Sequence, residues 1–187
     1  MDNKLMIKLV VGTEGVFFLC LIVSFIYLAY VSGYEPAHYN ALNITSTGIF
    51  SILLFSSSGT FYLSERSYKK GNLKSWKTWL LITIILGLIF LIGQGREYVH
   101  LITEEKMTLS SSLFGTSFYT LTGFHGFHVL VGLIVLSIIL CLGWAGDFKN
   151  GKSSVIPTVG IYWHFVDIVW VFVFTVVYIL PKTGVLK

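Results

Sequence analysis

The chain has 187 residues and a net charge of +4 at neutral pH; 55% of its residues are hydrophobic and only 12% are charged. Soluble domains carry about a quarter charged residues, so this composition excludes an ordinary soluble fold and indicates an integral membrane protein. The excess of basic residues does not indicate nucleic-acid binding, because the lysines and arginines lie in short segments between apolar runs.

Five apolar runs dominate the sequence. They predict transmembrane helices at about residues 8–31, 45–64, 79–99, 115–142 and 156–180. At ~1.5 Å of rise per residue, each run is long enough to cross a hydrocarbon core of ~30 Å. Glycine, serine and threonine are frequent within the runs, as is typical of helices that pack closely in a membrane. The predicted fold class is therefore an all-α integral membrane protein, a bundle of five transmembrane helices in one membrane domain over residues 1–187.

The loop charges predict the orientation of this bundle. The segment 65–78, after the second run, carries five basic residues against one acidic residue, and the segment 143–155, after the fourth run, carries two lysines. The positive-inside rule therefore predicts that the N-terminus and both of these segments are cytoplasmic. The C-terminal stretch "PKTGVLK" then lies outside, and its two lysines oppose this topology but are outnumbered.

The two cysteines predict neither a disulfide framework nor a cysteine-rich metal site. Cys20 and Cys141 each lie inside an apolar run, with no second cysteine nearby in the sequence. We expect both to be small buried hydrophobic residues.

Ionisable residues within apolar runs are candidates for function, because each costs about 2.5–3.5 kcal/mol at the centre of a membrane helix. They are Glu14, Arg96, Glu97, His125, His128, His164 and Asp167. Glu14, near the start of the first run, has two interpretations. It is either a buried and protonated carboxyl group, because burial disfavours the charged form, or a polar tether that bonds to a neighbouring helix near the cytoplasmic interface.

Arg96 and Glu97 are adjacent at the outer end of the third run, in "GQGREYVH". Adjacent residues do not face each other on a helix, so each would pair with another group or with a lipid headgroup. The favoured interpretation is that both side chains extend to the outer membrane interface.

The stretch "GFHGFHVLVG" places His125 and His128 on one helix face, and "WHFVDIVW" does the same for His164 and Asp167. A metal or haem site would need these groups to converge. However, His128 lies ~20 Å and His164 only ~12 Å from the predicted cytoplasmic ends of their runs. The favoured role for the histidines is therefore structural, with ring nitrogens bonding across helices and the glycines allowing close approach.

Three segments resemble subunit III of the haem–copper respiratory oxidases. They are "GQGREYVHL", "GTSFYTLTGFHGFHVLVGLIVL" and "GIYWHFVDIVWVFVFTVVYIL". In addition, Glu14 in "TEGVFF" is similar to a buried glutamate of that family. Long members have seven helices, so the resemblance implies the shorter five-helix form known from bacteria, with the lipid cleft of the long form open or completed by a neighbouring chain.

The resemblance implies an accessory subunit of an oxidase that uses cytochrome c or quinol, with no haem, copper or catalytic residue of its own. The haems and copper are then expected in partner subunits I and II. The resemblance also implies bound phospholipid, support of subunit I stability and proton uptake, a bacterial plasma membrane, and a place in a larger respiratory complex.

Three alternatives remain open on the sequence alone. The first is a subunit-III-like accessory protein of nitric oxide reduction. The second is a small transporter with Glu14 and Asp167 on an ion path, although the sequence shows no inverted repeat or broken helix. The third is a membrane haem protein, which would absorb visible light as an isolated chain.

Overall fold

The structure is a computed structural model that describes residues 3–32, 39, 41–110, 112–148 and 153–183. Five of its helices are long and apolar enough to cross a membrane, which confirms the predicted all-α five-helix bundle. They are α1 (Asn3–Ser32), α3 (Ile44–Lys69), α4 (Leu73–Thr103), α5 (Leu113–Ala145) and α6 (Val155–Phe174). The last helix continues as a π-helical turn, η1 (Thr175–Ile179), and a 3₁₀ turn, η2 (Leu180–Thr183).

Polar caps place the helix starts outside the apolar runs. The side chains of Asn43, Asn72 and Ser112 accept hydrogen bonds from backbone N–H groups three residues on, at 3.0, 3.1 and 3.0 Å. Such caps satisfy N–H groups that have no partner within the helix. The α4 helix begins at Leu73, whereas the apolar run predicted a start near residue 79. The difference arises because the first turns of α4 are polar, so they are helical without adding to the hydropathy that marks the run.

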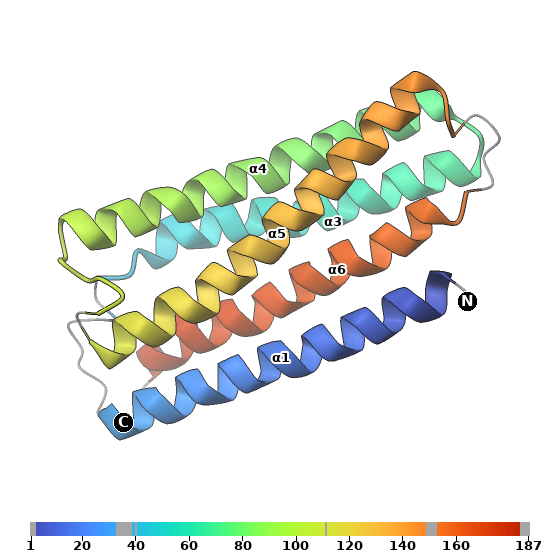
Figure 1. The fold of residues 1–187 in the computed structure, drawn as a ribbon. Helices are drawn as coiled ribbons and strands as arrows, with labels where there is room; N and C mark the ends of the chain where they lie inside the picture. The colour runs from blue at the N-terminus through green and yellow to red at the C-terminus, as the bar shows by residue number, and fades with distance from the viewer. Residues whose placement is uncertain (1–2, 33–38, 40, 111, 149–152, 184–187) are drawn as a thin grey trace.

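The helices lie lengthwise side by side, with α1 along one edge beside α6 and α5 crossing its neighbours obliquely (Figure 1). The α3 and α4 helices form an antiparallel hairpin, and α1 packs mainly on α5 and α6. Only 11% of the most apolar stretch of α1 is buried in this chain, against 44% for α5 and for α6. The α1 helix is therefore the least enclosed member of the bundle.

Tryptophans and glycines make the closest helix contacts. Trp163 of α6 is fully buried and lies against Gly132 of α5 and Gly87 of α4. In addition, the indole N–H groups of α6 donate to serines of α3, from Trp163 to Ser57 at 3.1 Å and from Trp170 to Ser51 at 2.8 Å. Glycine at the contact lets large rings fill the space between backbones, and the serines satisfy the ring N–H groups away from water.

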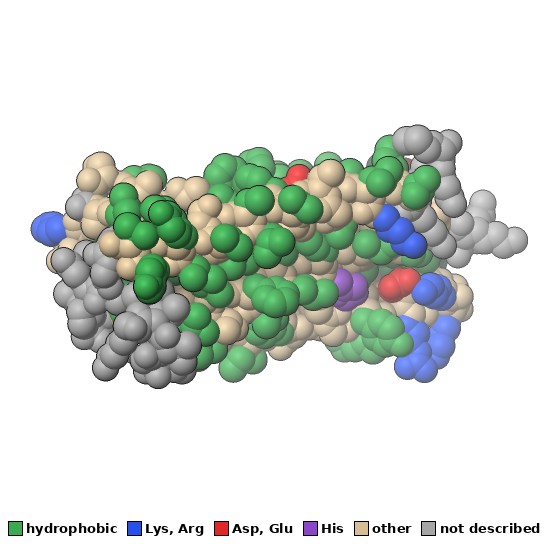
Figure 2. Space-filling view, turned by 90° about the horizontal axis from the view of Figure 1, so that it is seen from below, with side chains coloured by type: hydrophobic (Ala, Val, Ile, Leu, Met, Phe, Trp, Pro, Cys, Tyr) green, Lys and Arg blue, Asp and Glu red, His purple; other side chains and the backbone are tan. Residues whose placement is uncertain are grey.

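On the face of the bundle that Figure 2 shows, hydrophobic side chains are spread along the length, while lysine and arginine side chains gather toward the ends. The prediction that the two cysteines are buried was wrong, because Cys20 and Cys141 are both exposed on the outside of the helices. In a membrane-spanning chain this surface faces lipid or a partner, so hydropathy alone cannot separate the buried from the outer face.

Candidate functional site

Glu14 of α1 pairs with His128 of α5. The Glu14 Oε2 and His128 Nε2 atoms are 3.1 Å apart, and the two side chains are 32% and 12% exposed. The other ring nitrogen, Nδ1, lies 2.7 Å from the Phe124 carbonyl oxygen. A carbonyl can only accept, so Nδ1 carries a proton and a second proton lies between Nε2 and Oε2. The pair is thus either a neutral acid and a neutral imidazole or a carboxylate and an imidazolium.

His125 packs against aromatic rings and makes no hydrogen bond within the described chain. It is fully buried, and its ring stacks on that of Trp170 with centroids 4.7 Å apart. The rings of Phe18 and Phe90 meet it edge-on at 6.4 and 6.0 Å. The expectation that both histidines bond across helices is therefore met by the side chain of His128 but was wrong for His125, because its neighbours on α1, α4 and α6 are aromatic.

His164 and Asp167 of α6 meet on one hydroxyl group of α3. The Ser58 Oγ atom donates to a carboxylate oxygen of Asp167, and it lies 2.9 Å from His164 Nδ1. Since the hydroxyl proton goes to the carboxylate, the ring nitrogen is the donor to Ser58. Asp167 is buried, and its other oxygen, Oδ1, has no hydrogen-bond partner among the described residues.

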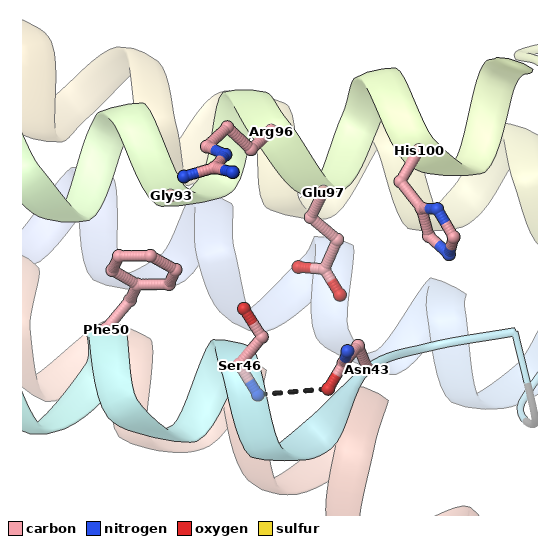
Figure 3. A pocket seen from close by; sticks show the side chains of 7 residues that line it. All are labelled: Asn43, Ser46, Phe50, Gly93, Arg96, Glu97 and His100. Carbon is pink, nitrogen blue, oxygen red and sulfur yellow. Dashed lines mark hydrogen bonds between the residues drawn. The ribbon is translucent and has the colours of Figure 1, made fainter.

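Glu97 of α4 joins three helices. Its Oε2 atom accepts hydrogen bonds from the hydroxyl groups of Thr47 on α3 and Tyr178 in η1, each at 2.9 Å. The interpretation that Glu97 extends to the membrane interface was therefore wrong, because two hydroxyl donors hold it against the bundle. Arg96 is exposed, as expected for a side chain that extends outward. Both residues line a hollow between α3 and α4, shown with its other lining residues in Figure 3.

The structure shows three polar clusters rather than one site, and the candidate His125 belongs to none of them. The first is the Glu14–His128 pair, the second is the Ser58, His164 and Asp167 cluster, and the third surrounds Glu97. Across the residues that the structure describes, no group of three or more His, Cys, Asp and Glu side chains could hold a metal ion. The arrangement can bind helices together and hold protons locally.

Sequence reasoning missed the neutral partners of these acids. They are Thr47, Ser58 and Tyr178. One signal was available, because the hydroxyl residues Thr47, Ser51 and Ser58 recur at spacings of four and seven residues, which place them on one face of α3. A row of hydroxyls on one face of a membrane helix indicates a face that bonds to neighbouring helices.

The chain was compared with known proteins. Residues 3–182 match the family model described as Cytochrome c oxidase subunit III. The chain is 38% identical to cytochrome c oxidase subunit 3 of Corynebacterium diphtheriae over 146 residues, which cover 78% of this chain and 70% of that protein. It is 34% identical to the Bacillus subtilis protein of the same name over 176 residues, which cover 94% and 85% of the two chains. The Alkalihalophilus pseudofirmus protein is 33% identical over 173 residues, which cover 92% and 84%. Because the family match extends over residues 3–182, from one end of the described bundle to the other, the chain belongs to the cytochrome c oxidase subunit III family.

Proposed function

We propose that this protein is the non-redox accessory subunit III of a haem–copper terminal oxidase. The observation that carries the proposal is the family match over residues 3–182, together with relatives named cytochrome c oxidase subunit 3. The chain is a multi-pass membrane protein that associates with other oxidase subunits. We place it beside subunits I and II, which would carry haem and copper, in a bacterial plasma membrane, since the relatives named above are bacterial.

The polar clusters support an accessory role over a catalytic one. Each candidate acid bonds to a side chain on another helix, as in the Glu14–His128 and Asp167–Ser58 contacts. These contacts link the helices of one bundle, which is what a subunit needs if it is to offer a stiff surface to a partner. We propose that the stiffened bundle, with bound phospholipid, supports subunit I and its proton uptake.

Glu14 is the residue we assign to this support. It lies on α1, the least enclosed helix, and its bond to His128 attaches that helix to α5. The loop charges predict that this end of α1 is cytoplasmic. We therefore propose that Glu14 and the surrounding lipid stiffen the neighbouring catalytic subunit near the region where protons enter.

The first experiment is a gentle detergent purification through a tag on this chain, followed by a reduced-minus-oxidised spectrum and mass spectrometry of the co-purifying proteins. We expect haem absorption to travel with a larger multi-span partner and to be lost when this chain is stripped off alone. The purified complex should also consume oxygen. Haem that stays with the isolated chain would overturn the proposal and make His125, His128 and His164 candidate ligands. A partner that reduces nitric oxide and not oxygen would contradict the oxidase assignment.

A further inference from the structure

One exposed face of α3 has the residue spacing of a helix that packs along another helix. Its members alternate at intervals of four and three residues, as in paired membrane helices. They are Gly48, Ile52, Phe55, Gly59 and Tyr62, which we call the α3 seam. All are exposed except Gly48, which is partly exposed. The seam therefore lies on the outside of the bundle.

Packing inside this chain does not explain the two glycines of the α3 seam. A Cβ atom on Gly48 or Gly59 would meet no atom of the described chain within 4 Å. By contrast, a Cβ atom on Gly160 of α6 would lie 2.7 Å from the Phe61 ring. Glycine is less favourable than alanine within a helix, and in membrane helices it is enriched where a second backbone approaches closely. Gly48 and Gly59 thus indicate a neighbour outside this chain.

His164 of α6 presents a free hydrogen-bond acceptor beside the seam. Its Nδ1 atom donates to Ser58, the residue next to Gly59. A neutral imidazole has one N–H group, so Nε2 is then an acceptor. No hydrogen bond to Nε2 is found in the described chain, and the atom is not among the enclosed atoms without a partner, which include both ring nitrogens of His125. The acceptor therefore reaches the surface of the bundle, well inside the span Val155–Ile179.

An acceptor at membrane depth restricts what can cover it. Lipid acyl chains have no hydrogen-bond donor, and a polar group left unsatisfied in hydrocarbon is costly. A neighbouring helix with a hydroxyl, amide or indole N–H group satisfies His164 Nε2. The same helix, packed along the seam, brings its backbone close to Gly59. One occupant therefore accounts for both the open glycines and the free acceptor.

We propose that the α3 seam, with His164 beside it, is the docking surface for a transmembrane helix of the larger haem-bearing oxidase subunit, and that this helix donates a hydrogen bond to His164 Nε2. The inference rests on the proposed function, because that proposal supplies the partner. It assigns the partner to the side of the bundle formed by α3 and α6, and it leaves the exposed face of α1 to lipid.

The first test adds bulk at an open glycine. G59L places leucine on the seam, and G12L is the matched control, because Gly12 is an exposed glycine of α1 whose Cβ atom would also meet no atom within 4 Å. Each tagged chain is purified at increasing detergent stringency, and the haem absorbance retained per chain is measured. We expect G59L to retain at least ~10-fold less haem-bearing partner, since leucine would hold the two backbones apart. G12L should retain as much as the unchanged chain.

The second test separates the two ring nitrogens of His164. In H164N the amide ends near the Nδ1 position, so the bond to Ser58 is kept and the acceptor at Nε2 is lost. The longer side chain of H164Q carries an amide to the Nε2 position. H164N should retain about 3-fold less partner, as expected for one hydrogen bond between membrane helices, and H164Q should restore most of it. Circular dichroism of the purified chains checks that all variants keep their helices.

The third test locates the partner in native membranes. Photoreactive benzoylphenylalanine replaces Ile52 of the seam or Leu19, which is similarly exposed on α1. We expect a cross-link from position 52, and not from position 19, to the haem-bearing subunit, identified by mass spectrometry. The docking surface would be overturned by a cross-link from position 19 alone, by a cross-link from position 52 to lipid only or to a second copy of this chain, or by equal retention in G59L and G12L.

Failure of the docking surface is distinguishable from failure of the proposed function. If the unchanged chain brings down no haem-bearing subunit, the accessory-subunit proposal fails and this inference fails with it. If the unchanged chain does bring down that subunit while G59L and H164N retain it fully, only the docking surface is wrong.

Discussion

Glu14, Glu97 and Asp167 each bond to a side chain on a helix other than their own. Their partners are an imidazole for Glu14 and hydroxyl groups for the other two acids. In a membrane, where water cannot satisfy a polar group, such a contact stabilises one arrangement of helices over others. These acids therefore specify which faces of the helices meet.

Replacement of Glu14 tests the support proposed for α1. In the E14A variant His128 loses its cross-helix partner, so the attachment of α1 to α5 is weakened. We expect oxidase activity to decline faster during sustained turnover, while initial rate and haem content stay unchanged. E14Q, which keeps a hydrogen-bonding group of the same size, is the control. Its turnover lifetime should lie between those of E14A and the unchanged protein. An unchanged turnover lifetime in E14A would count against the proposal.

His125 provides a contrasting residue, because its role rests on ring packing and not on its nitrogens. We expect H125F to keep thermal stability close to that of the unchanged protein, since phenylalanine can fill the same site among Trp170, Phe18 and Phe90. H125A should lower stability by about 3 kcal/mol, as is typical when a buried ring is truncated. Thermal unfolding of the purified complex measures both. Equal losses in the two variants would show that the ring nitrogens matter.

At the scale of the helix, α5 depends on glycines where aromatic rings cross it. A Cβ atom on Gly132 would lie 2.9 Å from the Trp163 ring, which is fully buried. By contrast, a Cβ atom on Gly123 of the same helix would meet only the Tyr98 hydroxyl oxygen, at 3.8 Å. The two positions differ in packing but share one helix.

This difference predicts opposite outcomes for the same substitution. G132A should destabilise the bundle by about 1–3 kcal/mol through overpacking against Trp163. G123A should be neutral or slightly stabilising, because alanine favours the helix by up to about 1 kcal/mol over glycine. Thermal inactivation of the purified complex compares the two variants. If G123A were as destabilising as G132A, close helix packing would not be the reason for glycine at position 132.

The number of helices followed from hydropathy, because in a membrane each spanning segment must be long, apolar and internally hydrogen-bonded. The hydrogen-bond partners of the acids could not be predicted from the sequence. Serine and threonine can also bond to the carbonyl group one turn earlier, as Ser51 does to that of Thr47. The row of hydroxyls on α3 therefore indicates a bonding face but does not reveal which side chain each hydroxyl meets. The neighbour of Glu97 across the bundle depends on how α3, α4 and α6 assemble, which a single sequence does not encode in any local pattern.

For the whole molecule, the orientation in the membrane is a prediction from the loop charges. Lys70 follows α3 and Glu105 follows α4, and both are exposed. In a background with C20A and C141A, we expect K70C to react with a membrane-impermeant maleimide only after cells are opened. E105C should react in intact cells. The reverse pattern would invert the topology and place the hollow beside Arg96 in the cytoplasmic leaflet.

The contact among Thr47, Glu97 and Tyr178 has a consequence for biogenesis. These residues lie on α3, α4 and η1, so the bond from Tyr178 forms only after the ribosome has delivered the α6 span and the turn that follows it. Until then Glu97 lies in the membrane without the hydrogen bond from the Tyr178 hydroxyl group. A nascent or truncated chain therefore exposes an incompletely bonded acid, a feature that membrane quality control can read as unfinished assembly.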